Sequence, residues 1–124
     1  MQEEKITFND LKFELHPTGG VKAKLEIGDL TISVIAGKHY YSYPREDVSP
    51  IGWTSFEVGI WNSQGDWVTF DLTQEIFGND ISRYGRDTEY KSEVLGWRTP
   101  EDIDEILSVM VEKEKISLTQ TINL

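Results

Sequence analysis

Carboxylates form the most distinctive pattern of chemically active residues in this chain. Between Arg45 and Arg83 the sequence contains no Lys or Arg, and the acids in that interval are Glu46, Asp47, Glu57, Asp66, Asp71, Glu75 and Asp80. A second stretch without basic residues runs from Thr99 to Glu112 and holds Glu101, Asp102, Asp104, Glu105 and Glu112. The formal net charge of -10 is therefore patterned along the chain. Such acidic segments repel nucleic acid and anionic membranes and attract basic protein surfaces.

The acids of the second stretch allow two interpretations. Carboxylates in the first turn of a helix stabilise it through the helix dipole by about 0.3–1 kcal/mol each, which alone would favour acids there. The dipole does not explain why basic residues stay absent as far as Glu112. On a helix, acids four residues apart lie about 6 Å apart along the axis, a spacing of the same order as that of nucleic-acid phosphates. We therefore consider both an ordinary solvated face and a partner-binding acidic surface, with the candidates Glu101, Asp102, Asp104, Glu105, Glu112, Asp66 and Asp71.

A second candidate surface is an aromatic segment inside a long irregular stretch, residues 37–54. Its candidate side chains are His39, Tyr40, Tyr41, Tyr43, Arg45 and Trp53. Tyr, Trp and Arg are typical anchors of binding interfaces, so residues 38–53 could hold a small molecule or a peptide. Packing of the tyrosines beneath their own loop is an equally good interpretation. Stacking on single-stranded bases is disfavoured by the net charge of the chain.

Catalytic and metal-binding chemistry has little support in the sequence. The two histidines, His16 and His39, have no nucleophile or carboxylate at a spacing that suggests a triad. A small hydrolase that uses His39 and a nearby acid is kept as a third hypothesis. Acids near glycines do not follow the spacing of a calcium loop, and no glycine pattern indicates a phosphate-binding loop. We expect a non-enzymatic protein that needs no cofactor or metal.

Length and composition predict one globular domain. The 124 residues are 38% hydrophobic and 11% aromatic, which is enough for a packed core. Cysteine is absent, which fits a reducing compartment. Residues 1–5 lack the apolar segment of a signal peptide, and no run approaches the roughly 20 apolar residues of a membrane span. We expect a cytoplasmic protein that binds neither a membrane nor nucleic acid directly.

Alternating apolar residues predict an antiparallel sheet in the first third of the chain. The expected segments are a short extended piece at 5–8, strands at 11–15, 21–27 and 30–36, and turns at 17–20 and 28–29. A further hairpin is expected from a strand at 55–61, a turn at 62–65 and a partner strand at 66–72. In that partner strand Asp66 and Asp71 are an odd number of residues apart, so they would need a bulge to share a face.

One amphipathic helix is predicted at about residues 100–114. Thr99 is a typical N-cap, Pro100 suits the first helical position, and acids follow in the first turn. The apolar stripe that should lie on the sheet is Ile103, Ile106, Leu107 and Met110. Residues 73–92 show no regular pattern beyond a helical turn at 74–77. Residues 116–124 alternate weakly around Gln120 and predict a closing edge strand.

The expected fold class is α+β, with an antiparallel sheet of about five to six strands and one C-terminal amphipathic helix packed on one face. Its expected core comprises Phe13, Leu25, Ile32, Val34, Phe56, Val58, Ile60, Ile103, Ile106, Leu107 and Met110.

The second half of the chain resembles small accessory proteins of phages and prophages. The similar stretches are Phe56-Glu57-Val58-Gly59-Ile60-Trp61 with Trp67-Val68-Thr69, and Val94-Leu95-Gly96-Trp97 followed by the helix that starts after Thr99. The resemblance implies a protein that acts inside a bacterial host, in a group that includes inhibitors of restriction and CRISPR nucleases. It implies no catalytic residues. Our leading hypothesis is an acidic interaction protein that occupies a basic surface of a host protein, such as the nucleic-acid groove of a defence enzyme.

Overall fold

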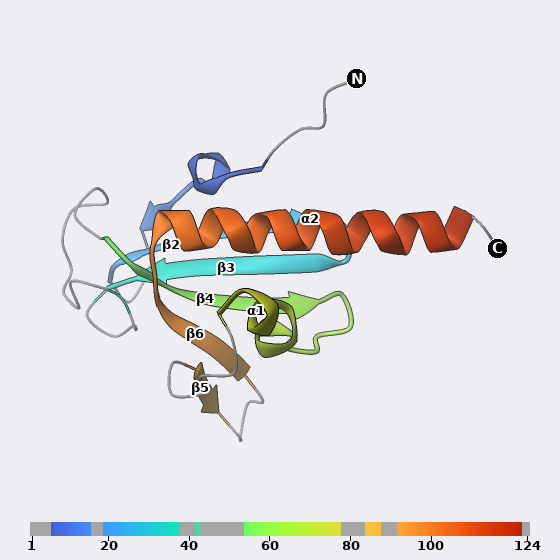
Figure 1. Cartoon of the computed structure of the whole chain (residues 1–124). Helices are drawn as coiled ribbons and strands as arrows, with labels where there is room; N and C mark the ends of the chain where they lie inside the picture. The colour runs from blue at the N-terminus through green and yellow to red at the C-terminus, as the bar shows by residue number, and fades with distance from the viewer. Residues whose placement is uncertain are drawn as a thin grey trace.

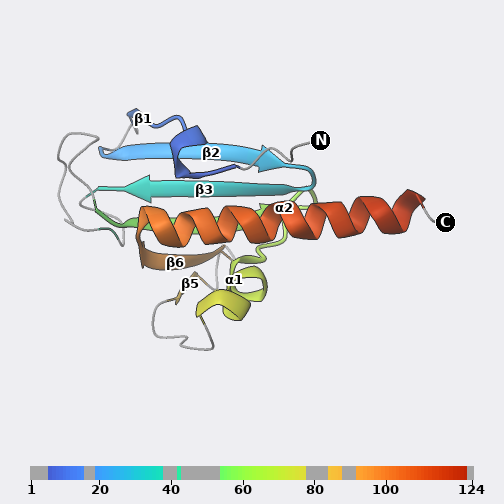
Figure 2. The same ribbon diagram turned by 45° about the horizontal axis from the view of Figure 1, so that its top comes forward.

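The chain folds into a mixed α+β structure in which two helices cover one face of an antiparallel sheet (Figures 1 and 2). The computed structural model describes residues 6–15, 19–37, 42, 54–77, 84–87 and 92–122, with the backbone alone at 84–87, 92–93 and 115–122. The elements are η1 (Phe8–Asp10), β1 (Glu14–Leu15), β2 (Val21–Ile27), β3 (Leu30–Ala36), β4 (Phe56–Asn62), α1 (Thr69–Phe77), β5 (Tyr84–Asp87), β6 (Ser92–Arg98) and α2 (Pro100–Ile122). The sheet has six strands in the order β1-β2-β3-β4-β6-β5. The expected fold class is confirmed.

The three central strands, β2, β3 and β4, form where apolar and polar residues alternate in the sequence. β2, β3 and β4 pair antiparallel, with Leu25 opposite Ile32 and Ile32 opposite Ile60, so every second side chain points to the same face. Gly28 and Asp29 make the turn between β2 and β3, where Gly28 has a φ of 59° that favours glycine. The backbone N–H of Asp29 donates to Glu114 Oε1 at 3.0 Å, which ties this turn to α2.

The core lies between this sheet and α2. The apolar stripe of α2 is fully buried together with residues of the central strands, and the buried set includes Ile32, Val34, Phe56, Val58, Ile60, Ile103, Ile106, Leu107 and Met110. Phe13 and Leu25 are partly buried and pack against this core. The predicted core is therefore confirmed, with those two residues at its margin. The edge strand predicted at 11–15 is shorter in the structure, where β1 contains only Glu14 and Leu15. Leu15 is 82% exposed and does not contribute to the core.

The predicted partner strand at 66–72 is wrong. After β4 the chain returns for a single bridge between Trp61 and Trp67, and then enters α1 at Thr69. The Thr69 hydroxyl takes the place of a strand partner, because it accepts from the Ile60 N–H at 2.9 Å and donates to the Ile60 carbonyl at 3.3 Å. Thr69, Leu72 and Thr73 are buried at helical spacing, and this period prevails over the alternation of Val68, Phe70 and Leu72.

Residues 73–92 contain more regular structure than the sequence pattern indicates. α1 continues to Phe77, β5 occupies 84–87, and β6 begins at residue 92 beside β4. β6 contains an extra residue, since Phe56 faces Arg98 whereas Val58 faces Leu95. Trp97 sits in this bulge with a φ of 56°, and the bulge lets both Leu95 and Arg98 become buried. That irregularity removes the simple alternation by which a strand is recognised.

The closing strand predicted at 116–124 is also wrong for the residues that the structure describes. α2 continues through Ile122 and extends beyond the ends of the strands below it (Figure 1). Leu118 and Ile122 are four residues apart, a spacing that fits a helix as well as a strand, so their even spacing did not discriminate between the two. Neither helix of the described chain is both long and apolar enough to span a bilayer.

Candidate binding surfaces

Two of the predicted partner-binding acids hold the start of α2. The side chains and backbones of Thr99 and Asp102 form a capping box, in which each backbone N–H donates to the other side chain at 3.1 Å. Asp102 also lies 3.8 Å from an Arg98 guanidinium nitrogen. Asp104 accepts a hydrogen bond from the backbone N–H of Phe8 at 2.7 Å, which fastens the N-terminal segment to α2. Asp102 and Asp104 therefore have structural roles.

The other three predicted partner-binding acids on α2 remain on the surface. Glu101, Glu105 and Glu112 are exposed, and Ser108 is exposed between them. Their spacing of four and seven residues places them along one side of the helix. We call these three carboxylates the acidic helix face. Its axial length is about 16 Å at 1.5 Å per residue.

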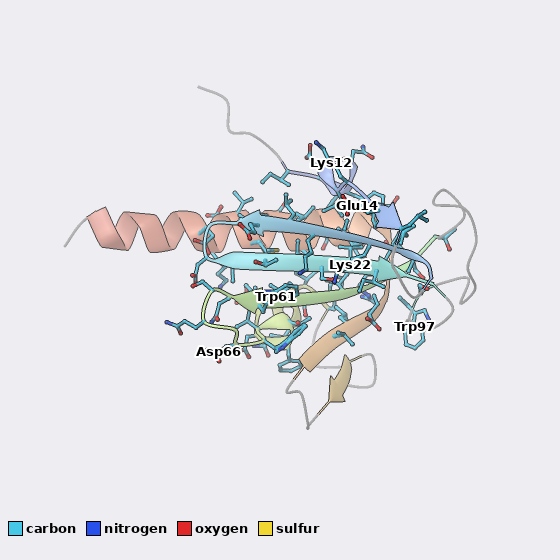
Figure 3. The ribbon with its side chains drawn as sticks, turned by 180° about the vertical axis from the view of Figure 1, so that it is seen from behind. Lys12, Glu14, Lys22, Trp61, Asp66 and Trp97 are labelled. Atoms are coloured by element: carbon cyan, nitrogen blue, oxygen red, sulfur yellow. The ribbon has the colours of Figure 1, made fainter. Side chains whose placement is uncertain are left out.

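Asp66 and Asp71 lie outside that face. Asp66 is exposed in the turn after β4, where the Asn62 side chain accepts hydrogen bonds from the backbone N–H groups of Gln64 and Asp66, both at 3.0 Å. Figure 3 places Asp66 at the same end of the sheet as Trp61. Asp71 is exposed in the first turn of α1. The position of Asp66 is explained by the turn, where Asp is a favoured residue, and that of Asp71 by its favourable interaction with the dipole of α1.

The candidates of the aromatic segment, His39, Tyr40, Tyr41, Tyr43, Arg45 and Trp53, lie outside the described residues. Within the segment Ser42 is described and buried. Its hydroxyl accepts from the Gly37 N–H at 3.0 Å and donates to the Gly37 carbonyl at 3.1 Å, which closes the end of β3. The binding role of this loop stays a prediction.

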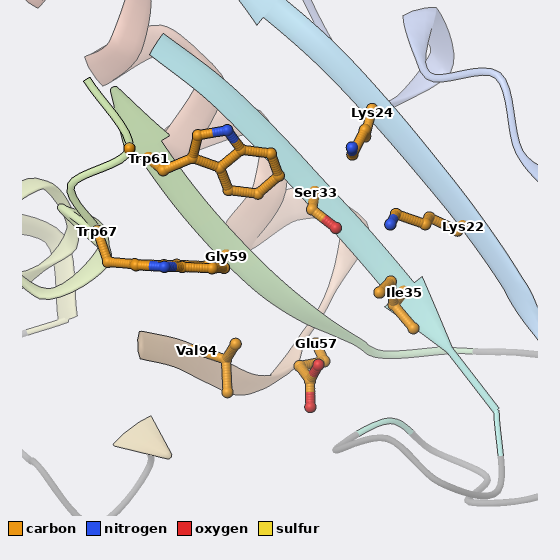
Figure 4. Close-up of a pocket in the computed structure, with 10 residues that line it drawn as sticks. Lys22, Lys24, Ser33, Ile35, Glu57, Gly59, Trp61, Trp67 and Val94 are labelled. Carbon is orange, nitrogen blue, oxygen red and sulfur yellow. The ribbon is translucent and has the colours of Figure 1, made fainter. Parts of the chain in front are cut away.

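The sheet face opposite the helices carries a groove that the sequence did not indicate. No helix in the part of the chain that the structure describes covers this face (Figure 3). The groove has a volume of about 430 Å³ and is lined by Lys22, Lys24, Ser33, Ile35, Glu57, Gly59, Trp61, Gly65, Trp67 and Val94 (Figure 4). These residues come from four strands and the turn after β4, so only the sheet register brings them together.

Two tryptophans form one side of the groove. The ring centroids of Trp61 and Trp67 lie 5.1 Å apart, with an angle of 54° between the ring planes. Trp67 is held opposite Trp61 by the short turn that Asn62 organises, in which the Asn62 N–H donates to the Asp66 carbonyl at 2.9 Å. Gly59 makes room for this ring, because a Cβ at that position would lie 2.7 Å from Trp67 Cζ3.

Two lysines supply the positive charge of the groove. Lys24 Nζ lies 5.3 Å from the centroid of the Trp61 ring, within the range of a cation–π interaction. Lys22 is two residues away on the same face of β2, and both ammonium ends point toward the centre of the groove (Figure 4). Burial lowers the pKa of Lys22, and the positive charge of Lys24 lowers it further.

No group of three or more His, Asp or Glu residues within the described chain could hold a metal ion. A scan of protein-family models, a search of the curated proteins and a search of the solved structures gave no match to this chain.

Proposed function

We propose that this protein is a non-enzymatic interaction protein whose acidic helix face binds a basic surface of another protein. The observation that carries the proposal is the exposure of Glu101, Glu105 and Glu112 along one side of α2, whereas the neighbouring Asp102 and Asp104 are used within the fold. A row of carboxylates without an internal role is suited to charge complementarity across an interface.

The partner that we propose is a nucleic-acid-binding enzyme of a bacterial host, and the protein would act as a phage-derived inhibitor of host defence. Two arguments support this partner. The carboxylates of the acidic helix face recur along the axis at about 6 Å and then about 10 Å, so they can occupy cationic sites that normally hold phosphates. The resemblance of the second half of the chain to phage accessory proteins points to the same setting.

Charge reversal with a matched control tests this function. The variant Glu101→Lys/Glu105→Lys/Glu112→Lys changes the acidic helix face, and Glu14→Lys/Glu26→Lys/Asp66→Lys makes the same change in net charge at exposed acids elsewhere. Each protein is immobilised, exposed to bacterial lysate at low salt and eluted with a salt gradient, and the partners are identified by mass spectrometry. We expect a nucleic-acid enzyme to bind the unchanged protein and the control, to be released by moderate salt, and to be lost from the first variant.

Binding that is indifferent to salt and to reversal of the acidic helix face would contradict the proposal. Loss of binding in both triple variants would also contradict it, because net charge rather than this face would then determine the interaction. Far-UV circular dichroism checks that the variants fold, since Glu101→Lys also removes an acid from the first turn of α2, worth about 0.3–1 kcal/mol.

A further inference from the structure

Positive charge and aromatic rings converge in the groove on the open sheet face. Among the residues that the structure describes, no carboxylate lies within ion-pair distance of Lys22 or Lys24, whereas Lys113 pairs with Glu75 at 3.5 Å and Arg98 lies 3.8 Å from Asp102. In a chain with a net charge of -10, two lysines that point into the same groove and have no acidic partner in the described part of the chain require an explanation. An anionic ligand would provide the missing countercharge.

The aromatic side of the groove defines the rest of the ligand. Trp61 and Trp67 are both partly exposed, and Gly59 has no side chain that would fill the space beside the Trp67 ring. Tryptophan rings at an angle of 54° offer both a face and an edge to a planar group. A volume of about 430 Å³ lies within the usual range for small-molecule sites.

We propose that this groove binds a small aromatic anion, with its ring against Trp61 and Trp67 and its negative group between the ammonium groups of Lys22 and Lys24. The hydroxyl of Ser33, which faces Lys24 across the β2–β3 register, lies beside that negative group as a hydrogen-bond donor. Glu57 is the acid in the lining and is engaged in an interaction of its own, so the anion lies toward Lys24 rather than toward Glu57. This site is separate from the acidic helix face and does not depend on the function proposed for it.

A pair of dyes that differ by one charged group tests the proposal. The anion 8-anilino-1-naphthalenesulfonate and the neutral N-phenyl-1-naphthylamine share the same ring system, and both become fluorescent when bound in an apolar site. We expect the sulfonate to bind to the folded protein and to weaken by at least about tenfold in Lys22→Gln/Lys24→Gln, a loss of about 1.4 kcal/mol. The neutral dye should bind more weakly than the sulfonate and should not respond to this variant.

A matched control separates local from general electrostatics. Lys12→Gln/Lys113→Gln removes the same charge from exposed lysines outside the groove and should leave the affinity for the sulfonate unchanged. Excitation of the tryptophans should transfer energy to the bound dye, and Trp67→Leu should lower both the transfer and the affinity. The lysine variants lie outside the core, so the proposal stays testable if Trp67→Leu does not fold.

Three outcomes would overturn the proposal. Equal affinity for the two dyes would show that the lysines do not select an anion. Equal weakening by both lysine double variants would show that the site is not this groove. Displacement of the dye by an oligothymidylate at lower concentration than by adenosine monophosphate would identify single-stranded nucleic acid, rather than a small molecule, as the occupant.

Discussion

At the junction of β4 and α1, the Thr69 hydroxyl makes hydrogen bonds with the backbone of Ile60 that a neighbouring strand would otherwise make. The variant Thr69→Val therefore tests how much this hydroxyl contributes to stability. Valine keeps the shape of threonine and loses the hydroxyl, so the Ile60 N–H loses the acceptor that lies 2.9 Å away. The Ile60 carbonyl keeps a partner, because the Val68 N–H donates to it at 2.9 Å. The variant therefore leaves one buried donor unpaired.

The magnitude follows from that single donor. Thr69 is fully buried, so water cannot replace the hydroxyl, and an unpaired buried donor costs about 1–3 kcal/mol. We expect the free energy of unfolding to fall by about 2 kcal/mol, which lowers the midpoint of thermal unfolding by about 8 °C in a domain of this size. Urea unfolding followed by circular dichroism measures the change, and the slope of the transition should stay the same.

Thr69→Ser is the control for this measurement. Serine keeps the hydroxyl and loses one buried methyl group, which costs about 1 kcal/mol. Thr69→Val should therefore be the less stable of the two variants. A Thr69→Val protein within about 0.5 kcal/mol of the unchanged protein would refute the assignment of the hydroxyl as the partner of Ile60.

The remaining predictions concern the groove and the buried arginine. Gly59→Ala should displace the Trp67 ring, because the new Cβ would lie 2.7 Å from Cζ3, and it should weaken binding of the aromatic sulfonate in a fluorescence titration while the protein stays folded. Arg98→Ala should lower the free energy of unfolding by about 3 kcal/mol in urea, since Arg98 is 4% exposed and its guanidinium lies 4.5 Å from the Phe77 ring centroid; a loss below about 1 kcal/mol would contradict this role. Lys22→Met should not destabilise the protein at pH 7. The pKa of Lys22 is lower in the folded than in the unfolded chain, so its charge opposes folding below the folded pKa, and this penalty is relieved as the pH rises toward the unfolded value. The stability difference between Lys22→Met and the unchanged protein should therefore narrow at alkaline pH, and a difference that widens there would contradict the assignment.

The parts of the fold that could be predicted are those with one strong period. In β2, β3 and the first half of α2 the apolar residues repeat cleanly, so strand or helix and the buried face follow directly from the pattern. The helical turn predicted at 74–77 lies within α1, but the start of this helix was predicted as a strand, because that segment alternates apolar residues as well as repeating them at helical spacing. β6 was missed because the bulge at Trp97 shifts the alternation by one residue.

The binding surfaces were harder to predict, because charge pattern and spacing do not reveal contacts. Asp102 and Asp104 look like Glu101 and Glu105 in the sequence, yet the first two make hydrogen bonds within the fold and the last two are exposed. The groove residues stand at alternate positions of separate strands, where Lys22 and Lys24 resemble the ordinary polar face of a half-buried strand. Their convergence with Trp61 and Trp67 depends on strand register, which is a long-range property.

The close approach of Trp61 and Trp67 also gives this protein an internal optical reporter. Two indole rings with centroids 5.1 Å apart and inclined at 54° couple their electronic transitions, and coupled transitions produce paired circular-dichroism bands of opposite sign. The pair spans the point where β4 ends and the chain enters α1, so its signal reports on that junction, whereas the helical signal reports on both helices. Loss of the paired bands before the helical signal on heating would reveal a local opening there, without any added dye or label.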